Sequence, residues 1–178
     1  MITYQTYGGL PPEPMLGQLL DILSRLFISQ SREAWLADLT QKATTYLDFQ
    51  TILAVADGRV VGCKLGYDWH LTADKPGEAA ATKRTFYSWL GGVDPAYRGR
   101  GIAGALMQLQ HEACQQAGYV AVRTHTYNQW RDMLIMNLRQ GFQIIGTQPG
   151  KHGLTIMLEK ELTQCFLTYR LLIKYSNH

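Results

Sequence analysis

The chain has 178 residues, 46% of them hydrophobic and 17% charged, with a formal net charge of +3. This composition predicts one globular unit and excludes a disordered chain, and the mild charge and scattered basic residues argue against a nucleic-acid partner. No apolar run approaches the roughly 18 residues of a membrane span, and the first residues show no signal-peptide pattern, so we expect a cytoplasmic protein.

The first half of the chain is expected to hold one strand, then two helices, then a hairpin of two strands. Residues 2–7 alternate apolar and polar side chains, which is typical of a strand. Leucines at helical spacing predict a helix from about Pro14, and Ser31 is a candidate cap for a second helix. A hairpin at Asp57-Gly58 then joins strands at 51–56 and 60–69, and residues 71–83 read as a loop.

The second half predicts the remaining elements in a regular order. It holds a strand at 84–93, a helix at 102–116, a strand at 119–126, a helix at 129–140 and a hairpin of 142–147 with 154–158. Gly118 and Gly141 follow the two helices, where glycine favours helix termination. The whole order is β-α-α-β-β-β-α-β-α-β-β.

A glycine-dense loop, Arg98-Gly99-Arg100-Gly101, separates the strand at 84–93 from the helix at 102–116. The first N–H groups of a helix lack intrahelical partners and carry the positive end of its dipole, so they bind anions. The two glycines let a ligand approach the backbone, and the two arginines add donors that suit phosphate. The loop is therefore expected to hold a pyrophosphate.

Two common nucleotide loops fit this segment poorly. A Walker loop requires Gly-Lys-Ser or Gly-Lys-Thr, and neither pair occurs in the chain. The string Gly99-Arg100-Gly101-Ile102-Ala103-Gly104 matches G-x-G-x-x-G, but the predicted hairpins before it are not the repeating βαβ units of a dinucleotide fold.

The segment instead resembles the acetyl-CoA loop of the GNAT superfamily of N-acetyltransferases. The family loop, [QR]-x-x-G-x-[GA], is met by the six residues Arg98 to Ala103, and the preceding V-x-P by Val93 and Pro95. The downstream family pattern is met by Asn128, Met133 and Gly141-Phe142. The predicted element order is also that of the family.

The resemblance implies an α/β (α+β) fold: a mixed, mostly antiparallel central sheet of about seven strands, flanked by about four helices. Two neighbouring strands would splay apart at the CoA site and leave backbone groups for the pantetheine arm. The residues implied for the acetyl-CoA site are Gly92, Val93, Arg98, Gly99, Arg100, Gly101, Ile102, Ala103 and Asn128. Asn128 is equally suited to capping the next helix.

The residues that transfer protons depart from the family pattern. The family's usual acid is a tyrosine about five residues before the Gly-Phe pair, where this chain has Asn137; Tyr127 is a possible substitute. The strand at 84–93 lacks the carboxylate that often serves as base. Candidates for the base are His125, Asp68 and His70, each of which could also be a surface or capping residue, and ordered water is a further alternative.

Residues that could bind the amine substrate are predicted from the alternation of side chains along the strands. Alternation places Phe86, Ser88 and Leu90 on one face and Tyr87 and Trp89 on the other. Trp89 could line an amine pocket or belong to the core. Arg123 should share a face with His125, where it could bind a substrate carboxylate.

The resemblance implies an acetyl-CoA-dependent N-acetyltransferase that acts on a primary amine of a small molecule or peptide. A CoA-binding sensor without turnover is the alternative. Three cysteines without close spacing, Cys63, Cys114 and Cys165, predict buried thiols, and no metal is expected. Residues 1–160 should form a single domain, and the apolar residues 161–178 should pack on it or on a second subunit of a homodimer.

Overall fold

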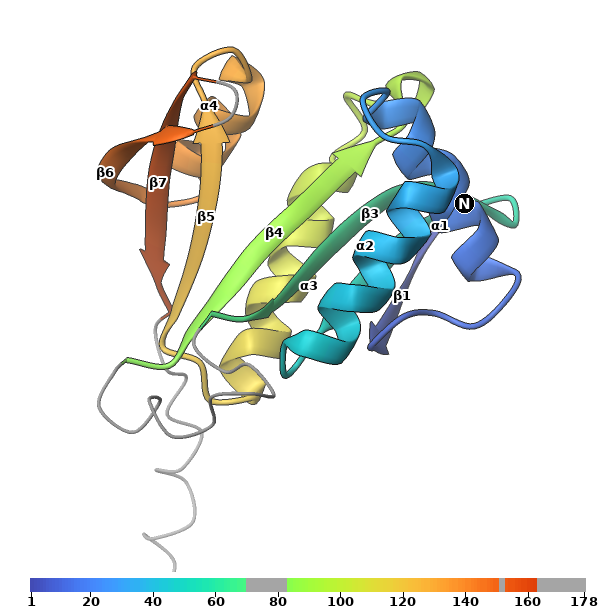
Figure 1. Ribbon diagram of the computed structural model, residues 1–178, viewed down its shortest axis with the longest axis horizontal. Coiled ribbons are helices and arrows are strands. Elements are labelled where there is room, and N and C mark those ends of the chain that lie inside the picture. Colours follow the sequence, from blue (N-terminus) through green and yellow to red (C-terminus); the bar gives the residue numbers. More distant parts are fainter. Residues whose placement is uncertain (70–82, 151–152, 163–178) are drawn as a thin grey trace, which may run out of the picture.

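The computed structural model describes residues 1–69, 83–150 and 153–162 (Figure 1). The elements, in chain order, are β1 (Ile2–Gly8), α1 (Met15–Leu26), α2 (Arg32–Thr45), β2 (Gln50–Ala56), β3 (Arg59–Asp68), β4 (Thr85–Val93), α3 (Ile102–Gln116), β5 (Ala121–Tyr127), α4 (Arg131–Arg139), β6 (Gln143–Gly150) and β7 (Gly153–Glu161). The predicted element order and the mixed α/β fold class are confirmed. The loop expected at 71–83, His70, Cys165 and nearly all of the apolar extension lie outside the described residues.

Local sequence explains where several helices begin and end. The Ser31 side chain accepts a hydrogen bond from the N–H of Ala34 and caps α2, as expected. Gly118 and Gly141 have φ of +80° and +88°, the left-handed conformation that terminates α3 and α4. The start of α4 differs, because the residue at its N-cap is Trp130 and no side-chain hydrogen bond caps the helix there. Asn128 is therefore not the helix cap that the sequence allowed.

The seven strands form one sheet in the order β1-β2-β3-β4-β5-β7-β6. All neighbours are antiparallel except β4 and β5, which run parallel and pair only through Thr85–Ala121, Phe86–Val122 and Tyr87–Arg123. Beyond these pairs the two strands diverge toward the top of Figure 1. The predicted splayed pair is thus present, and the backbone of β4 after Tyr87 does not pair with β5.

Helices cover both faces of the sheet. In Figure 1, α1 and α2 lie in front of the sheet and α3 lies behind it. The front core joins α1 and α2 to one face of β2 and β3, with Leu19, Leu23, Leu53 and Leu65 almost fully buried. A second core lies between α3 and the opposite face of β2, β3 and β4. Strands β4, β5 and β7 pack on α3 through a third core.

A β-bulge in β4 alters the predicted alternation of side chains. Leu65 of β3 pairs with Leu90, and the next residue, Gly66, pairs with Ser88, so Trp89 is an extra residue in the ladder. Leu90 consequently packs against the front core together with Tyr87 and Trp89. The expectation that Leu90 shares a face with Ser88 was wrong, because alternation holds only while the register is unbroken.

Gly66 of β3 lies where the bulged strand β4 comes too close to leave room for a side chain. A Cβ added there would meet the Phe86 ring and lie 2.5 Å from the Tyr87 carbonyl oxygen. We expect Gly66→Ala to lower the free energy of unfolding by about 1–3 kcal/mol, because backbone and a packed ring cannot both move aside. Urea denaturation measures this loss. Gly8→Ala is the control, since a Cβ on Gly8 of β1 meets nothing within 4 Å; equal losses in both variants would contradict the prediction.

Candidate active site

Asp94 holds the glycine loop in place at the end that follows β4. The Asp94 side chain accepts a hydrogen bond from the N–H of Ala96 (3.0 Å), which caps a short 3-10 turn, and it pairs with Arg25 at the end of α1 (3.2 Å). Gly99 and Gly101 have φ of +74° and +76°, and a Cβ built on either would meet nothing within 4 Å. The loop therefore leaves open space beside its backbone.

The two loop arginines contact the loop itself. Arg98 Nε donates to the carbonyl oxygen of Val93 (3.2 Å), and an Nη of Arg100 donates to that of Ala96 (3.4 Å). The Arg100 guanidinium also lies 5.0 Å from the centroid of the Tyr97 ring. Both residues are exposed, so the loop surface is positively charged close to the first turn of α3.

The open end of the β4–β5 pair faces this helix start, because α3 follows β4 after the short loop. At the closed end, the Thr124 hydroxyl donates to the Ser88 carbonyl oxygen (2.8 Å), and the Ser88 hydroxyl donates to Gln110 of α3 (2.7 Å). Gly92 and Val93 pair with β3 but lie on the part of β4 that does not pair with β5. A linear ligand with a phosphate at one end can therefore follow β4 from the loop to the closed end.

On the front face of the sheet, His125 lies among aromatic rings at the closed end of the splay. Its Nδ1 is 3.2 Å from the Tyr87 hydroxyl, and its ring centroid is 5.7 Å from that of Trp69. The other ring nitrogen, Nε2, is buried and has no hydrogen-bond partner in the described part of the chain. Burial lowers the pKa of His125, and the neighbouring Arg123 charge lowers it further.

These contacts keep His125 neutral near physiological pH. Burial raises the pKa of Tyr87 to about 12, so its hydroxyl stays protonated and can donate or accept toward Nδ1. When Nδ1–H donates to the Tyr87 oxygen, Nε2 is left as a proton acceptor. The pair thus has the arrangement of a general base and the group that orients it.

Arg123 lies beside His125 on the same face, as predicted, but another side chain already binds it. Glu159 of β7 accepts from Arg123 Nε and Nη2 at 3.1 and 2.6 Å, and it also pairs with Lys83 at 3.1 Å. The Arg123 and Lys83 contacts lower the pKa of the Glu159 carboxyl despite its partial burial. A substrate carboxylate at Arg123 would have to compete with Glu159.

Trp89 lies on the front face, packed against the core at the bulge. Lys42 of α2 places its Nζ 4.8 Å from the Trp89 ring centroid, and the Trp35 centroid is 6.5 Å away. The face of the ring that could attract an amine thus already carries a lysine cation.

Three other sequence candidates lie between the end of β5 and the end of α4. Asn137 is only 2% exposed inside α4, and its carbonyl oxygen accepts hydrogen bonds at the helix end. Tyr127 packs edge-on against Trp130, with ring centroids 4.9 Å apart. Asn128 is exposed and lines, with α4, a hollow of about 500 Å³.

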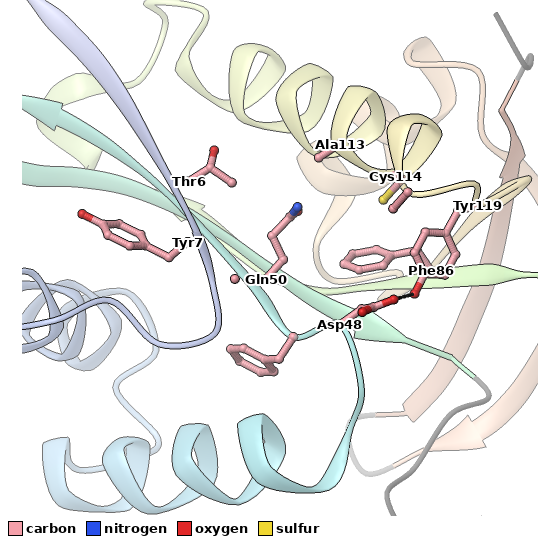
Figure 2. A pocket seen from close by; sticks show the side chains of 11 residues that line it. Thr6, Tyr7, Asp48, Gln50, Phe86, Ala113, Cys114 and Tyr119 are labelled. Carbon is pink, nitrogen blue, oxygen red and sulfur yellow. Dashed lines mark hydrogen bonds between the residues drawn. The ribbon is translucent and has the colours of Figure 1, made fainter. Parts of the chain in front are cut away.

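Asp68 faces the back of the sheet and belongs to a buried hydrogen-bond network. The Tyr119 hydroxyl is 2.7 Å from an oxygen of Asp68 and 2.6 Å from one of Asp48. Asp48 and Tyr119 line a pocket of about 210 Å³ between β1, β2 and the C-terminal half of α3, remote from the start of α3 (Figure 2). The structure does not bring Asp68 together with His125.

Sequence reasoning missed three residues behind the splay: Lys64 of β3, and Gln110 and His111 of α3. All three are at least 94% buried, and Gln110 Nε2 and His111 Nε2 have no hydrogen-bond partner among the described residues. Burial and the Lys160 and Lys64 charges lower the pKa of His111 to about 3. Polar residues within an apolar strand or helix were the only signal, and the sequence does not show that they face one another.

Two of the three cysteines lie in the core. Cys63 and Cys114 are free and buried, and burial raises the pKa of each to about 12, so both are unreactive thiols. In the described part of the chain, no group of three or more His, Cys, Asp or Glu side chains could hold a metal ion. None of the described helices is long and apolar enough to cross a membrane.

A mixed seven-stranded sheet with one splayed parallel pair and a glycine loop leading into a helix defines the GNAT class of fold. The sequence model of the acetyltransferase (GNAT) domain matches residues 48–144, more than half of the chain. The chain therefore belongs to the GNAT acetyltransferase family. No curated protein shows significant sequence similarity to it.

Solved structures share this fold at low sequence identity. A GNAT-family acetyltransferase from Elizabethkingia anophelis with acetyl-CoA bound has a TM-score of 0.65 at 19% identity, covering 90% of this chain and 98% of the other. NAA60 from Arabidopsis thaliana, in complex with a bisubstrate analogue, has a TM-score of 0.68 at 18% identity, covering 92% and 100%. An acetyltransferase of the GNAT family from Desulfovibrio desulfuricans has a TM-score of 0.69 at 13% identity, covering 92% and 100%.

Proposed function

We propose that the protein is an acetyl-CoA-dependent N-acetyltransferase that transfers the acetyl group directly to a primary amine. The observation that carries this proposal is the stretch of β4 that does not pair with β5 and leads from the β5 contact to the glycine loop and the start of α3. Family membership and the acetyl-CoA bound to the Elizabethkingia structure support it.

The residues of the loop and of β4 would hold acetyl-CoA in one orientation. The N–H groups from Arg98 to Ala103 would bind the pyrophosphate, aided by the helix dipole and by the open space beside Gly99 and Gly101. The pantetheine arm would lie along β4 as an added strand, using backbone groups near Gly92 and Val93. The thioester would then reach the closed end of the splay.

The amine would approach from the front face, where His125 lies. Its nitrogen attacks the thioester carbonyl carbon, His125 Nε2 accepts a proton from it, and the carbon–sulfur bond breaks to release CoA as a thiolate. Alignment of the two reactants is the main contribution of such a site, and it supplies roughly 7–11 kcal/mol in the best cases. The aromatic residues around His125 favour an amine attached to an apolar or aromatic group over a strongly acidic one.

Two measurements test this function. A ligand that binds the folded state raises its thermal stability, so acetyl-CoA and CoA should raise the melting temperature while ATP and NAD should not. Release of CoA thiol should then be assayed over amino acids, polyamines and peptides with free N-termini. Absence of a shift with either CoA species contradicts the proposal, and a shift without turnover on any amine would indicate a CoA-binding sensor.

A further inference from the structure

Lys64 lies at the centre of the sheet and has no partner for its charge. Its side chain is 6% exposed, and within the described residues its ammonium group makes neither a hydrogen bond nor an ion pair. A buried cation without a counter-charge costs free energy that a protein normally avoids. Because the fold keeps Lys64 buried despite this cost in free energy, we infer that its amine has a function.

The Lys64 side chain covers the back of β4 at its pairing partner, Gly91. A Cβ on Gly91 would lie 2.9 Å from Lys64 Cδ and 3.4 Å from Lys64 Nζ. Gly91 lies three residues along β4 from Ser88, about 10 Å at the usual rise per residue, within the stretch that does not pair with β5. The amine therefore lies beside the wall of the splay next to Gly92, about 10 Å along β4 from the closed end at Ser88.

The groups around Lys64 on this side are hydrogen-bond donors or bases. Gln110 Nε2 and His111 Nε2 are buried without partners, and Lys160 Nζ of β7 is 3.4 Å from His111 Nδ1. Because an ammonium can only donate, His111 Nδ1 accepts and its Nε2 carries the hydrogen. None of the described carboxylates pairs with Lys64, His111 or Lys160. The neighbouring Cys63 thiol faces the front core.

This arrangement favours a ligand that carries negative charge where it meets the Lys64 ammonium. Resting on the function proposed above, the pantetheine arm follows β4 past Gly92, so the thiol end of CoA lies beside Gly91 on the way to the closed end of the splay. Negative charge develops on its sulfur when the carbon–sulfur bond breaks. We propose that the Lys64 ammonium stabilises this departing thiolate and protonates it. The sulfur gains the proton, free CoA leaves as the thiol, and neutral Lys64 recovers a proton from solvent before the next turnover.

Lys64 would act as the general acid that α4 lacks. Asn137 occupies the position of the usual tyrosine and cannot give up a proton. Burial lowers the pKa of Lys64 to about 8, so the amine is mostly protonated at neutral pH but gives up its proton more readily than an exposed lysine. Activity that depends on protonated Lys64 is lost as the pH rises through about 8.

The direct test is the acidity of the thiol of bound CoA, which does not require turnover. Thiolate absorbance in the ultraviolet is titrated for CoA that is free, bound to the wild type, and bound to Lys64→Met. A cation within about 4–6 Å lowers such a pKa by about 1–3 units. We expect this shift in the wild-type complex and its loss in Lys64→Met. A bound thiol with the pKa of free CoA in the wild type overturns the proposal, whether or not the variant folds.

Kinetics provide the second readout. We expect Lys64→Met to lower kcat by about 10²-fold, with a small change in the KM for acetyl-CoA, and to lose the decline above about pH 8. Arg59→Met is the matched control on the same strand, because Arg59 is exposed at the hairpin end of β3. An unchanged pH profile in Lys64→Met contradicts the proposal. Failure of the wild type to bind any CoA species would instead refute the proposed function.

Discussion

Gly101→Glu is expected to abolish the thermal stabilisation of the protein by acetyl-CoA. Gly101 precedes α3 in the left-handed conformation, and its missing side chain leaves open space where the pyrophosphate is expected. A carboxylate there would face the phosphates and remove the attraction of the helix start. Like charges brought together cost several kcal/mol, so the affinity should fall by about 10³-fold. Calorimetry with acetyl-CoA measures the loss.

Gly58→Glu separates the loss of the anion site from the strain of the substitution. Gly58 is in the hairpin between β2 and β3 with φ of +75°, close to the +76° of Gly101, and a Cβ there also meets nothing within 4 Å. Both variants therefore have the same left-handed strain, about 1–2 kcal/mol. We expect both to unfold at similarly reduced temperatures, with only Gly58→Glu still binding acetyl-CoA. Similar affinities in the two variants would refute the role of the loop.

Features set by neighbours in the sequence could be predicted from the sequence. The bounds of α3 were predicted at both ends, because Gly101 precedes the helix and Gly118 terminates it by its permitted φ. The loop that begins at Arg98 was predicted for the same reason. The backbone conformation of this loop depends on the residues within it, so the sequence pattern predicts the conformation.

Features set by contacts across the sheet could not be predicted in this way. The bulge at Trp89 depends on how β3 pairs with β4, and strict alternation failed there. Glu159 pairs with Arg123 because β5 lies beside β7, 36 residues apart in the chain. A lysine in an apolar strand does not reveal that its amine lies beside the splay. The region that would bind the amine and the groups that would transfer protons are both formed by such contacts. Their surroundings therefore differed most from what the sequence predicted.

His125 is expected to be the residue on the front face whose loss most reduces turnover. His125→Gln keeps the approximate size of the ring but provides no proton acceptor at neutral pH, so kcat should fall by about 10²–10⁴-fold. Binding of acetyl-CoA should change little, because the loop and β4 are separate from this side chain. Steady-state kinetics and calorimetry on one variant therefore distinguish a loss of chemistry from a loss of binding.

The pH dependence of kcat decides between a base and a packing residue. Burial and the Arg123 charge lower the pKa of His125 from its usual 6.5, so the base is neutral and active above that lowered pKa and inactive below it. The wild-type kcat should rise with pH through a value below 6.5, and His125→Gln should lose this inflection. Tyr87→Phe removes the hydrogen bond to Nδ1 (3.2 Å) but leaves the base, so it should displace the inflection without abolishing it. An inflection that persists in His125→Gln would assign the proton acceptor to another group, such as an ordered water.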